Sequence, residues 1–230
     1  MTRFLVINKK ERFDIEETLR IFAEASENNP TPDGNWQGDG WGISYVDPYL
    51  KWRGYKTFVS IWKCMDFFNI FMPSNIFMMH ARTLEAEEQY VSEDHNMPYY
   101  NDEISFVFDG VEDEQQINLE DGYFFDKFWG KILQLDQNDF ETGLRELCNG
   151  ITLNKVGLKA ANFVISDKKN IYIYSKTENH NNAYYKLKYQ INENQIIIAS
   201  QEYTMEGAEL WKDIPDSELK VFPMFEMLTK

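Results

Sequence analysis

Cysteine and histidine are scarce in this chain of 230 residues. It holds two cysteines, Cys64 and Cys148, and three histidines. Two cysteines cannot form the disulfide framework of a small secreted domain. Three scattered histidines leave little for a zinc site. We therefore expect reduced thiols, a cytoplasmic location, and neither a metal nor a cofactor.

Long apolar runs and basic residues are also in short supply. The most apolar region, residues 58–81, is interrupted by Lys63, Asp66 and Pro73, so no segment is expected to span a bilayer. The N-terminus lacks the apolar core of a signal peptide, because Lys9-Lys10-Glu11-Arg12 follows its first apolar run at once. Basic residues number 23 against 38 acidic ones, which gives a net charge of −15. Such a field repels phosphates and anionic lipid heads, so we expect neither nucleic acid nor membrane partners.

What the chain has in quantity is side chains that build a core. Hydrophobic residues make up 43% of it and aromatic residues 16%, which indicates a globular protein rather than a disordered one. A length of 230 residues suits one domain of two or more layers. Because no repeat, low-complexity tract or linker interrupts the chain, we predict a single domain over residues 1–230.

The expected strands and helices fall into separate blocks. Apolar residues recur at helical spacing from Ile15 to Ala25, behind Asp14 as a capping residue. Further helices are expected at residues 60–71, 126–135 and 139–148. Strands are expected at residues 4–7, 76–79, 104–110, 161–165, 171–174, 184–189, 195–200 and 219–222. This order predicts an α+β fold in which two largely antiparallel sheets pack together with helices outside.

The beginning of the chain places a hydroxyl next to a buried strand. Thr2 stands just before the apolar run Phe4-Leu5-Val6-Ile7. If Met1 is removed, Thr2 carries both a hydroxyl and the α-amine, and a threonine whose own amine is its base is a known activated nucleophile. That amine titrates near pKa ~8, so a useful fraction of it is neutral. The alternative is that Thr2 only begins a strand.

Three further places carry residues suited to a site. Gly40 and Gly42 flank Trp41, and glycines this dense form either a plain tight turn or a place where another chain segment approaches closely. Arg82 follows a buried strand, where it forms either a structural ion pair or a clamp for a ligand carboxylate. Asp109-Gly110 closes the next predicted strand, and this pair predicts a sharp turn.

In their order along the chain, these segments resemble the class II (type 2) glutamine amidotransferase domain. Asp39-Gly40-Trp41-Gly42-Ile43 is similar to its Asp-Gly-Trp-Gly-Ile segment, and His80-Ala81-Arg82 to its His-x-Arg. Met97-Pro98-Tyr99 stands where that family has His-Pro-Phe, and Phe106-Val107-Phe108-Asp109-Gly110 where it has Phe-x-His-Asn-Gly. The resemblance runs over essentially the whole chain. It implies the fold of an N-terminal-nucleophile (Ntn) hydrolase, a four-layer αββα sandwich.

The resemblance also implies roles for individual residues. In that family an N-terminal Cys attacks the side-chain amide of glutamine, so Thr2 would be the nucleophile and its α-amine the base. Asp109 and the amide of Gly110 would occupy the oxyanion hole. The residues expected to bind substrate are Arg82 for its carboxylate, Asp126 for its ammonium, and Trp41.

The departures from the family are as informative as the matches. The family's Cys is Thr2, and its Asn is Asp109, whose ionised carboxylate only accepts hydrogen bonds and would repel an oxyanion. Losing one oxyanion donor costs about 10²–10³ in rate. Three histidines of the family are replaced by Gln37, Met97 and Phe108. We therefore expect a divergent or weakly active amide hydrolase rather than an ordinary glutaminase.

Two other functions stay open from the sequence. One is a binding module that holds an amino-acid-like ligand or a partner protein without turnover. The other is a glutaminase subunit that feeds ammonia to a separate synthase, which is the family's usual use. The expected partner is a small-molecule amide or amino acid, with a synthase subunit or a second copy of the chain as further candidates.

Overall fold

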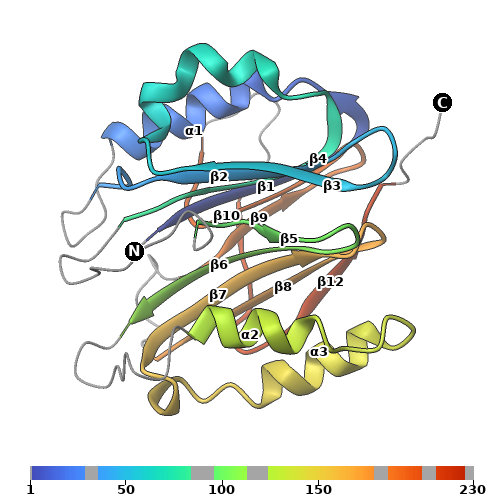
Figure 1. Cartoon of the computed structure of the whole chain (residues 1–230). Helices are drawn as coiled ribbons and strands as arrows, with labels where there is room; N and C mark the ends of the chain where they lie inside the picture. The colour runs from blue at the N-terminus through green and yellow to red at the C-terminus, as the bar shows by residue number, and fades with distance from the viewer. Residues whose placement is uncertain are drawn as a thin grey trace.

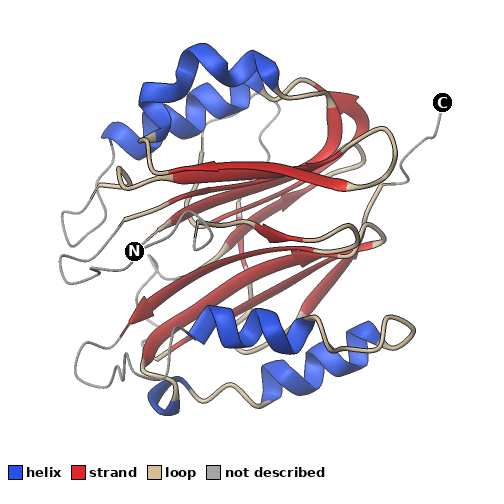
Figure 2. Cartoon of the chain, in the orientation of Figure 1, coloured by secondary structure: helices blue, strands red, loops and turns tan. Residues whose placement is uncertain are grey.

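Two β-sheets lie face to face, and each is covered on its outer side by helices (Figures 1 and 2). The structure is a computed structural model that describes residues 2–28, 36–83, 96–112, 124–178, 186–203 and 211–225. The fold is therefore α+β, a four-layer αββα sandwich, which confirms the sequence prediction. The helices of the described ranges are α1 (Glu16–Asn28), the 3₁₀-helices η1 (Ile61–Ile70) and η4 (Leu153–Lys155), α2 (Phe124–Ile132) and α3 (Phe140–Asn149).

The larger sheet has seven strands in the order β11-β9-β10-β1-β4-β2-β3, and neighbouring strands pair in antiparallel fashion. The strand that begins the chain, β1, lies at its centre. The strands are β1 (Arg3–Phe13), β2 (Trp41–Val46), β3 (Trp52–Thr57), β4 (Ser74–Ala81), β9 (Lys188–Ile191), β10 (Gln195–Ala199) and β11 (Lys212–Asp213).

The smaller sheet has five strands in the order β12-β8-β7-β6-β5, again antiparallel. Its strands are β5 (Tyr99–Tyr100), β6 (Ser105–Glu112), β7 (Leu158–Ser166), β8 (Asn170–Thr177) and β12 (Lys220–Pro223). The start of β1 and the end of β6 lie at the same side of the sandwich (Figure 1). Thr2, the first described residue, therefore lies close to the smaller sheet.

Strand β4 shows how the sequence fills both faces of the larger sheet. All eight of its residues are buried, and side chains of successive strand residues point to opposite faces. Ile76 and Met78 belong to the core between the sheets, whereas Phe77 and Met79 belong to the core beneath α1 and η1. This double burial explains why residues 76–79 read as a continuous apolar run.

Helix α1 covers the larger sheet with the residues that its periodicity predicts. Its buried positions include Leu19 and Phe22, which are fully enclosed. Oδ1 of Asp14 accepts a hydrogen bond of 2.8 Å from the backbone N–H of Glu16, the first helical residue. The predicted cap therefore satisfies one of the donors that a helix start leaves open.

The predicted turn at Asp109-Gly110 is wrong. Both residues lie inside β6, where Asp109 pairs with Asn162 and Gly110 with Ala161 on β7. A Cβ on Gly110 would collide with the ring of Phe108, so the glycine makes room for a side chain two residues back in the same strand. The Asp-Gly pair thus serves packing and a side-chain contact, not chain reversal.

Other boundaries move by a few residues. Strand β9 covers Lys188–Ile191 rather than residues 184–189, and α2 begins at Phe124 instead of Asp126. Strand β3 is missed by the sequence prediction, because Trp52–Thr57 shows no regular apolar alternation and only its two ends are buried. The predicted segment at residues 60–71 is helical, although it forms the 3₁₀-helix η1.

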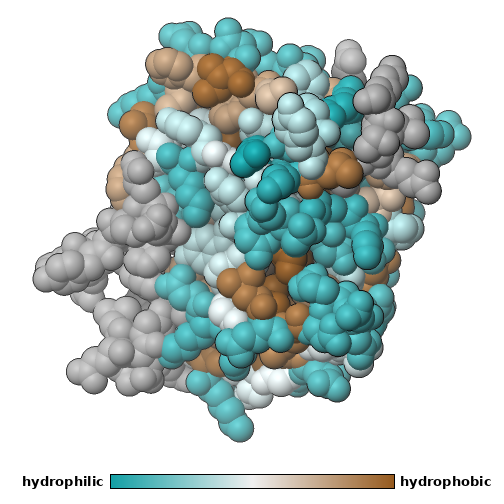
Figure 3. Space-filling view, turned by 45° about the vertical axis from the view of Figure 1, so that its right-hand side comes forward, coloured by the Kyte–Doolittle hydropathy of each residue, from teal (hydrophilic) through white to brown (hydrophobic). Residues whose placement is uncertain are grey.

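The face drawn in Figure 3 is mainly hydrophilic and carries a few apolar patches. Large exposed apolar side chains include Phe67 and Ile70 on η1 and Met72 just after it. No helix within the described ranges is both long and apolar enough to cross a membrane.

Candidate functional site

The hydroxyl of Thr2 and the carboxylate of Asp109 meet between the two sheets. Oγ1 of Thr2 donates a hydrogen bond of 2.9 Å to Oδ1 of Asp109. The backbone N–H of Thr2 donates to the same oxygen at 3.2 Å. Two residues separated by 107 positions in sequence therefore form the contact that defines the candidate site.

Strand alternation explains why these two side chains meet. On β1, Phe4 and Val6 belong to the core between the sheets, and Thr2 stands two residues before Phe4 with the same orientation. On β6, Val107 belongs to that core as well, and Asp109 follows it by two residues. The contact is thus a continuation of the inter-sheet core in which polar groups replace apolar ones.

Burial changes the acid–base behaviour of Asp109. Its side chain is almost fully enclosed, with 3% of the residue exposed. Burial disfavours the charged form and raises the pKa of Asp109 to about 6, although the positive charge of the N-terminus, the hydrogen bonds from Thr2 and the charge of Arg3 act in the opposite direction. The carboxyl is therefore poised to gain or lose a proton near neutral pH.

Arg82 lies next to Thr2 across the larger sheet. The last registered pair of β1 and β4 is Arg3 with Ala81, and Thr2 and Arg82 are the residues that come next on the two strands. Arg82 is buried, with 5% of it exposed. Its backbone N–H donates to the carbonyl of Gly40 at 2.9 Å, which continues the pairing toward β2. The guanidinium thus belongs to the same end of the sandwich as the Thr2 hydroxyl.

The side chain of Asn96 holds the guanidinium of Arg82. Nη1 of Arg82 donates to Oδ1 of Asn96 at 3.4 Å. Nδ2 of Asn96 donates in turn to the carbonyl of Thr57 at 2.8 Å. Because both Arg82 and Asn96 are buried, this chain of contacts fixes the position of a cation inside the protein.

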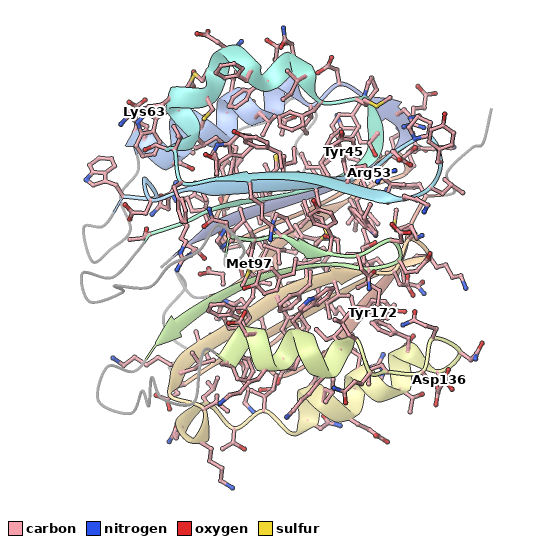
Figure 4. The ribbon with its side chains drawn as sticks, in the orientation of Figure 1. Tyr45, Arg53, Lys63, Met97, Asp136 and Tyr172 are labelled. Atoms are coloured by element: carbon pink, nitrogen blue, oxygen red, sulfur yellow. The ribbon has the colours of Figure 1, made fainter. Side chains whose placement is uncertain are left out.

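Two glycines of the Asp39–Ile43 segment make room for this arrangement. Gly40 has φ +130°, and a Cβ there would lie 2.6 Å from the carbonyl of Thr57 and 2.7 Å from Nδ2 of Asn96. A Cβ on Gly42 would collide with the carbonyl of Met97. The expected close approach is confirmed, and Figure 4 shows Met97 between the two sheets.

His80 adds a neutral imidazole to the same end of β4. It continues the inter-sheet face of Ile76 and Met78, and 3% of it is exposed. Burial, together with the positive charges of Arg82 and Lys56, lowers the pKa of His80 to about 3. Among the described residues neither ring nitrogen has a hydrogen-bond partner of ordinary geometry; only the backbone of Phe108 gives a weak favourable interaction.

Asp126 approaches the site from another direction. It lies in the first turn of α2, and Oδ1 of Asp126 accepts a hydrogen bond of 2.7 Å from the hydroxyl of Tyr99 on β5. The ring of Tyr99 packs against Phe125 and Trp129 of the same helix. Because α2 covers the outer face of the smaller sheet (Figure 1), Asp126 and Thr2 reach that sheet from opposite faces.

Trp41 points away from the Thr2–Asp109 contact. Its ring lies in the core under η1, with centroids 5.7 Å from Phe68 and 6.1 Å from Phe71. Thr2 belongs to the opposite face of the larger sheet. The structure therefore gives Trp41 a packing position, and its expected contact with substrate stays a prediction.

Sequence reasoning did not single out two groups near the site. Asn96 directly precedes the Met97-Pro98-Tyr99 segment, but nothing in the pattern showed that it would bond Arg82. Lys56 lies on the unpredicted strand β3, and its Nζ stands 4.8 Å from the ring centroid of Tyr99. His95 and His180 lie outside the described residues. The described part of the chain contains no cluster of three or more His, Cys, Asp or Glu suited to a metal ion.

Several solved structures share this fold. The chain superposes on a glutamine aminotransferase class-II domain protein from Silicibacter pomeroyi with a TM-score of 0.59 and 11% identity, over 96% of this chain and 94% of that one. It superposes on glutamine phosphoribosylpyrophosphate amidotransferase from B. subtilis with a TM-score of 0.57 and 15% identity, over 98% of this chain and 50% of that one. The chain has the fold of a class II glutamine amidotransferase domain.

A third structure with this fold is an allosteric regulatory enzyme of purine biosynthesis, at a TM-score of 0.56 and 16% identity over 99% of this chain and 50% of that one. The chain therefore spans about half the length of these two larger enzymes. No protein-family model matches the sequence, and no curated protein matches it. At such low identities the likeness of class II amidotransferase domains to this chain concerns the fold, and activity has to be argued from the site.

Proposed function

We propose that the protein is a divergent class II glutamine amidotransferase-like amide hydrolase with Thr2 at the position of the nucleophile. The observation that supports this most directly is the 2.9 Å hydrogen bond from the Thr2 hydroxyl to Asp109. It occurs at the amino end of a central strand in a fold that class II amidotransferases share. A nucleophile and a proton acceptor within this distance meet the geometric requirement for covalent catalysis.

The buried cation next to Thr2 supports a small amide that also bears a carboxylate. Arg82, positioned by Asn96, offers a guanidinium that can grip a carboxylate in bidentate fashion. Asp126, which is bonded by Tyr99 and approaches the smaller sheet from its other face, stays the proposed partner of a substrate ammonium group. Glutamine carries all three groups, so it is the first substrate to test. The Gly110 amide is the proposed donor to the oxyanion.

We expect the protein to act in the cytoplasm without nucleic acid or membrane partners. The acidic composition, with 38 acidic against 23 basic residues, supports this expectation. A synthase subunit that accepts ammonia, or a second copy of the chain, are the protein partners to look for. Co-purification from native extract followed by mass spectrometry would identify either one.

Ammonia release from L-glutamine, measured together with the intact mass of the protein, tests the proposed function. Hydrolysis by the wild type that is abolished by Thr2→Ala is the expected result. Ser217→Ala, which removes an exposed hydroxyl bonded to Asp216, is the matched control. The intact mass shows whether Met1 is retained in the active preparation. Equal activity of Thr2→Ala and wild type would contradict the proposal.

A second candidate function is a binding module for an amino-acid-like ligand. The observation that favours it is the buried Asp109 carboxyl beside Thr2, because a carboxylate there would repel a developing oxyanion. This candidate predicts that calorimetry detects glutamine or glutamate binding that requires Arg82, without any ammonia release. Turnover that depends on Thr2 would exclude it.

A further inference from the structure

We propose that Asp109 is the general base of this site and takes the proton directly from the hydroxyl of Thr2. The inference rests on the proposed function, since it names the group that activates the nucleophile in amide hydrolysis. The α-amine that serves as base in the family would then not be required. Asp109 would be a catalytic residue rather than an impaired oxyanion donor.

The geometry around Asp109 is that of a base oriented toward one proton. Oγ1 of Thr2 lies 2.9 Å from Oδ1, within the range that direct proton transfer requires. The backbone N–H of Thr2 holds the same oxygen at 3.2 Å, so the carboxylate cannot turn away without losing two bonds. With its proton directed at Asp109, the hydroxyl keeps its lone pairs for attack on a carbonyl carbon.

The surroundings tune the carboxyl for this task. A carboxylate with an ordinary pKa near 4 is a weak base, and burial raises the pKa of Asp109 to about 6. Two positive charges act on Asp109: that of the N-terminus and, more weakly, that of Arg3, whose guanidinium bonds the carbonyl of Ala25 on the other face of the larger sheet. Lys56 on β3 and Arg82 on β4 act on the neighbouring His80. The cations keep Asp109 from becoming still more basic, so it remains mostly ionised at pH 7.

The proton can be followed through the reaction. Asp109 accepts the hydroxyl proton while Oγ1 of Thr2 bonds to the amide carbon, and the carbonyl electron pair moves to oxygen. The electron pair returns, the C–N bond breaks, and protonated Asp109 gives its proton to the departing nitrogen, which leaves as ammonia. Asp109 then takes a proton from a water molecule while the oxygen of that water attacks the acyl carbon. Collapse releases the acid, and the proton returns to Thr2.

This assignment removes the electrostatic objection to Asp109. The carboxylate would repel an oxyanion only while ionised, and it becomes neutral in the step that creates the oxyanion. It also connects the two departures from the family. A thiol is partly ionised at neutral pH and needs little help, whereas the Thr2 hydroxyl needs a base beside it. The change of Cys to Thr2 and of Asn to Asp109 then form one functional unit.

The pH dependence of hydrolysis tests the inference. Ammonia release from L-glutamine and 4-nitroaniline release from L-γ-glutamyl-4-nitroanilide are measured from about pH 4.5 to pH 8.5. The kcat/KM of the wild type should rise with pH through an apparent pKa near 6, the value that burial gives Asp109. Asp109→Asn should lower kcat by at least about 100-fold, because general bases contribute about 10²–10⁴.

The controls separate catalysis from folding. Asp136→Asn removes an exposed carboxylate in the turn after α2 and should leave rate and pH profile unchanged (Figure 4). Asp109→Ala makes space for formate, and addition of formate should restore part of the lost rate. Restoration cannot come from a variant that failed to fold. Thermal melting curves of every variant accompany the assays.

Failure of this inference differs from failure of the proposed function. An Asp109→Asn variant that is as active as wild type, or more active, would overturn the base role while leaving Thr2 as the nucleophile. The base role is equally overturned if the acidic limb of the pH profile persists in that variant. Wild-type protein that hydrolyses neither substrate would overturn the proposed function, and the base role with it. Activity confined to molecules without Met1 would show that the α-amine is the base.

Discussion

The guanidinium of Arg82 is held by Asn96, whose own amide is anchored on the backbone of strand β3. The two hydrogen bonds measure 3.4 Å from Nη1 of Arg82 to Oδ1 of Asn96 and 2.8 Å from Nδ2 of Asn96 to the carbonyl of Thr57. Residues 96 and 97 thereby pack against Gly40 and Gly42, at the start of β2, and fix a buried cation beside Thr2. The orientation of that cation is set by a residue outside the strand that carries it.

We expect Asn96→Ala to weaken substrate binding more than catalysis. Without its amide, Arg82 loses a fixed orientation, and a hydrogen bond to a charged group is worth about 1.5–3 kcal/mol. The KM for glutamine should rise about tenfold with kcat changed less than about threefold. Asn138→Ala, which alters an exposed turn, is the control. A lower kcat at constant KM would show that Asn96 acts on the chemical step instead.

The sequence predicted the layers of the fold because they depend on local patterns. Doubly buried β4 reads as an apolar run, and α1 reads as an amphipathic helix with a cap. Local pattern could not predict that Asp109 and Gly110 lie inside a strand. The propensity of this pair favours a turn, and only the packing of Phe108 and the contact with Thr2 keep the pair inside β6.

The motifs predicted that three residues would lie at one end of the sandwich, but they gave no sign of a residue that tertiary packing supplies. Thr2, Arg82 and Asp109 are brought together as expected, although their roles remain predictions. Asn96 carries no local signal, since its two bonds reach Arg82, 14 residues away, and Thr57, 39 residues away. Which face of β2 carries Trp41 depends on strand register, and in the structure that face packs against η1.

Asp109 should make the protein less stable at neutral pH than at acidic pH. Its pKa is raised to about 6 in the folded state, so the stability it contributes is present below pH ~4 and lost as pH rises through 6. The full effect is about 3 kcal/mol. Asp109→Asn should therefore raise the free energy of urea unfolding at about pH 7.5 and change it little at about pH 4. An equal gain at both values would assign the effect to something other than ionisation.

His80 should make the protein less stable at acidic pH than at neutral pH, the reverse of the effect of Asp109. Its pKa is lowered to about 3, so the stability it contributes is present above pH ~6.5 and is lost as pH falls toward 3. Between about pH 7.5 and pH 5 the loss should reach about 2 kcal/mol. His80→Leu should abolish it and, by removing buried nitrogens that lack partners in the described structure, stabilise the fold by about 1–3 kcal/mol. His80→Gln should remove the pH dependence with a smaller gain, and unchanged acid sensitivity in both variants would contradict the assignment.

Two glycine-to-alanine changes should have opposite signs, since their surroundings differ. A Cβ at Gly42 would collide with the carbonyl of Met97, so Gly42→Ala must push segment 96–97 away from β2 and should cost about 3 kcal/mol or more. It should also raise the KM for glutamine, because Asn96 would no longer reach Arg82. At Gly130 in α2 a Cβ meets no atom of the described structure within 4 Å, and Gly130→Ala should stabilise the protein by about 0.5–1 kcal/mol with unchanged kinetics. Chemical unfolding and steady-state kinetics of both variants test these two expectations. A Gly42→Ala protein as stable as wild type would mean that the contact between Gly42 and the carbonyl of Met97 is looser than the structure indicates.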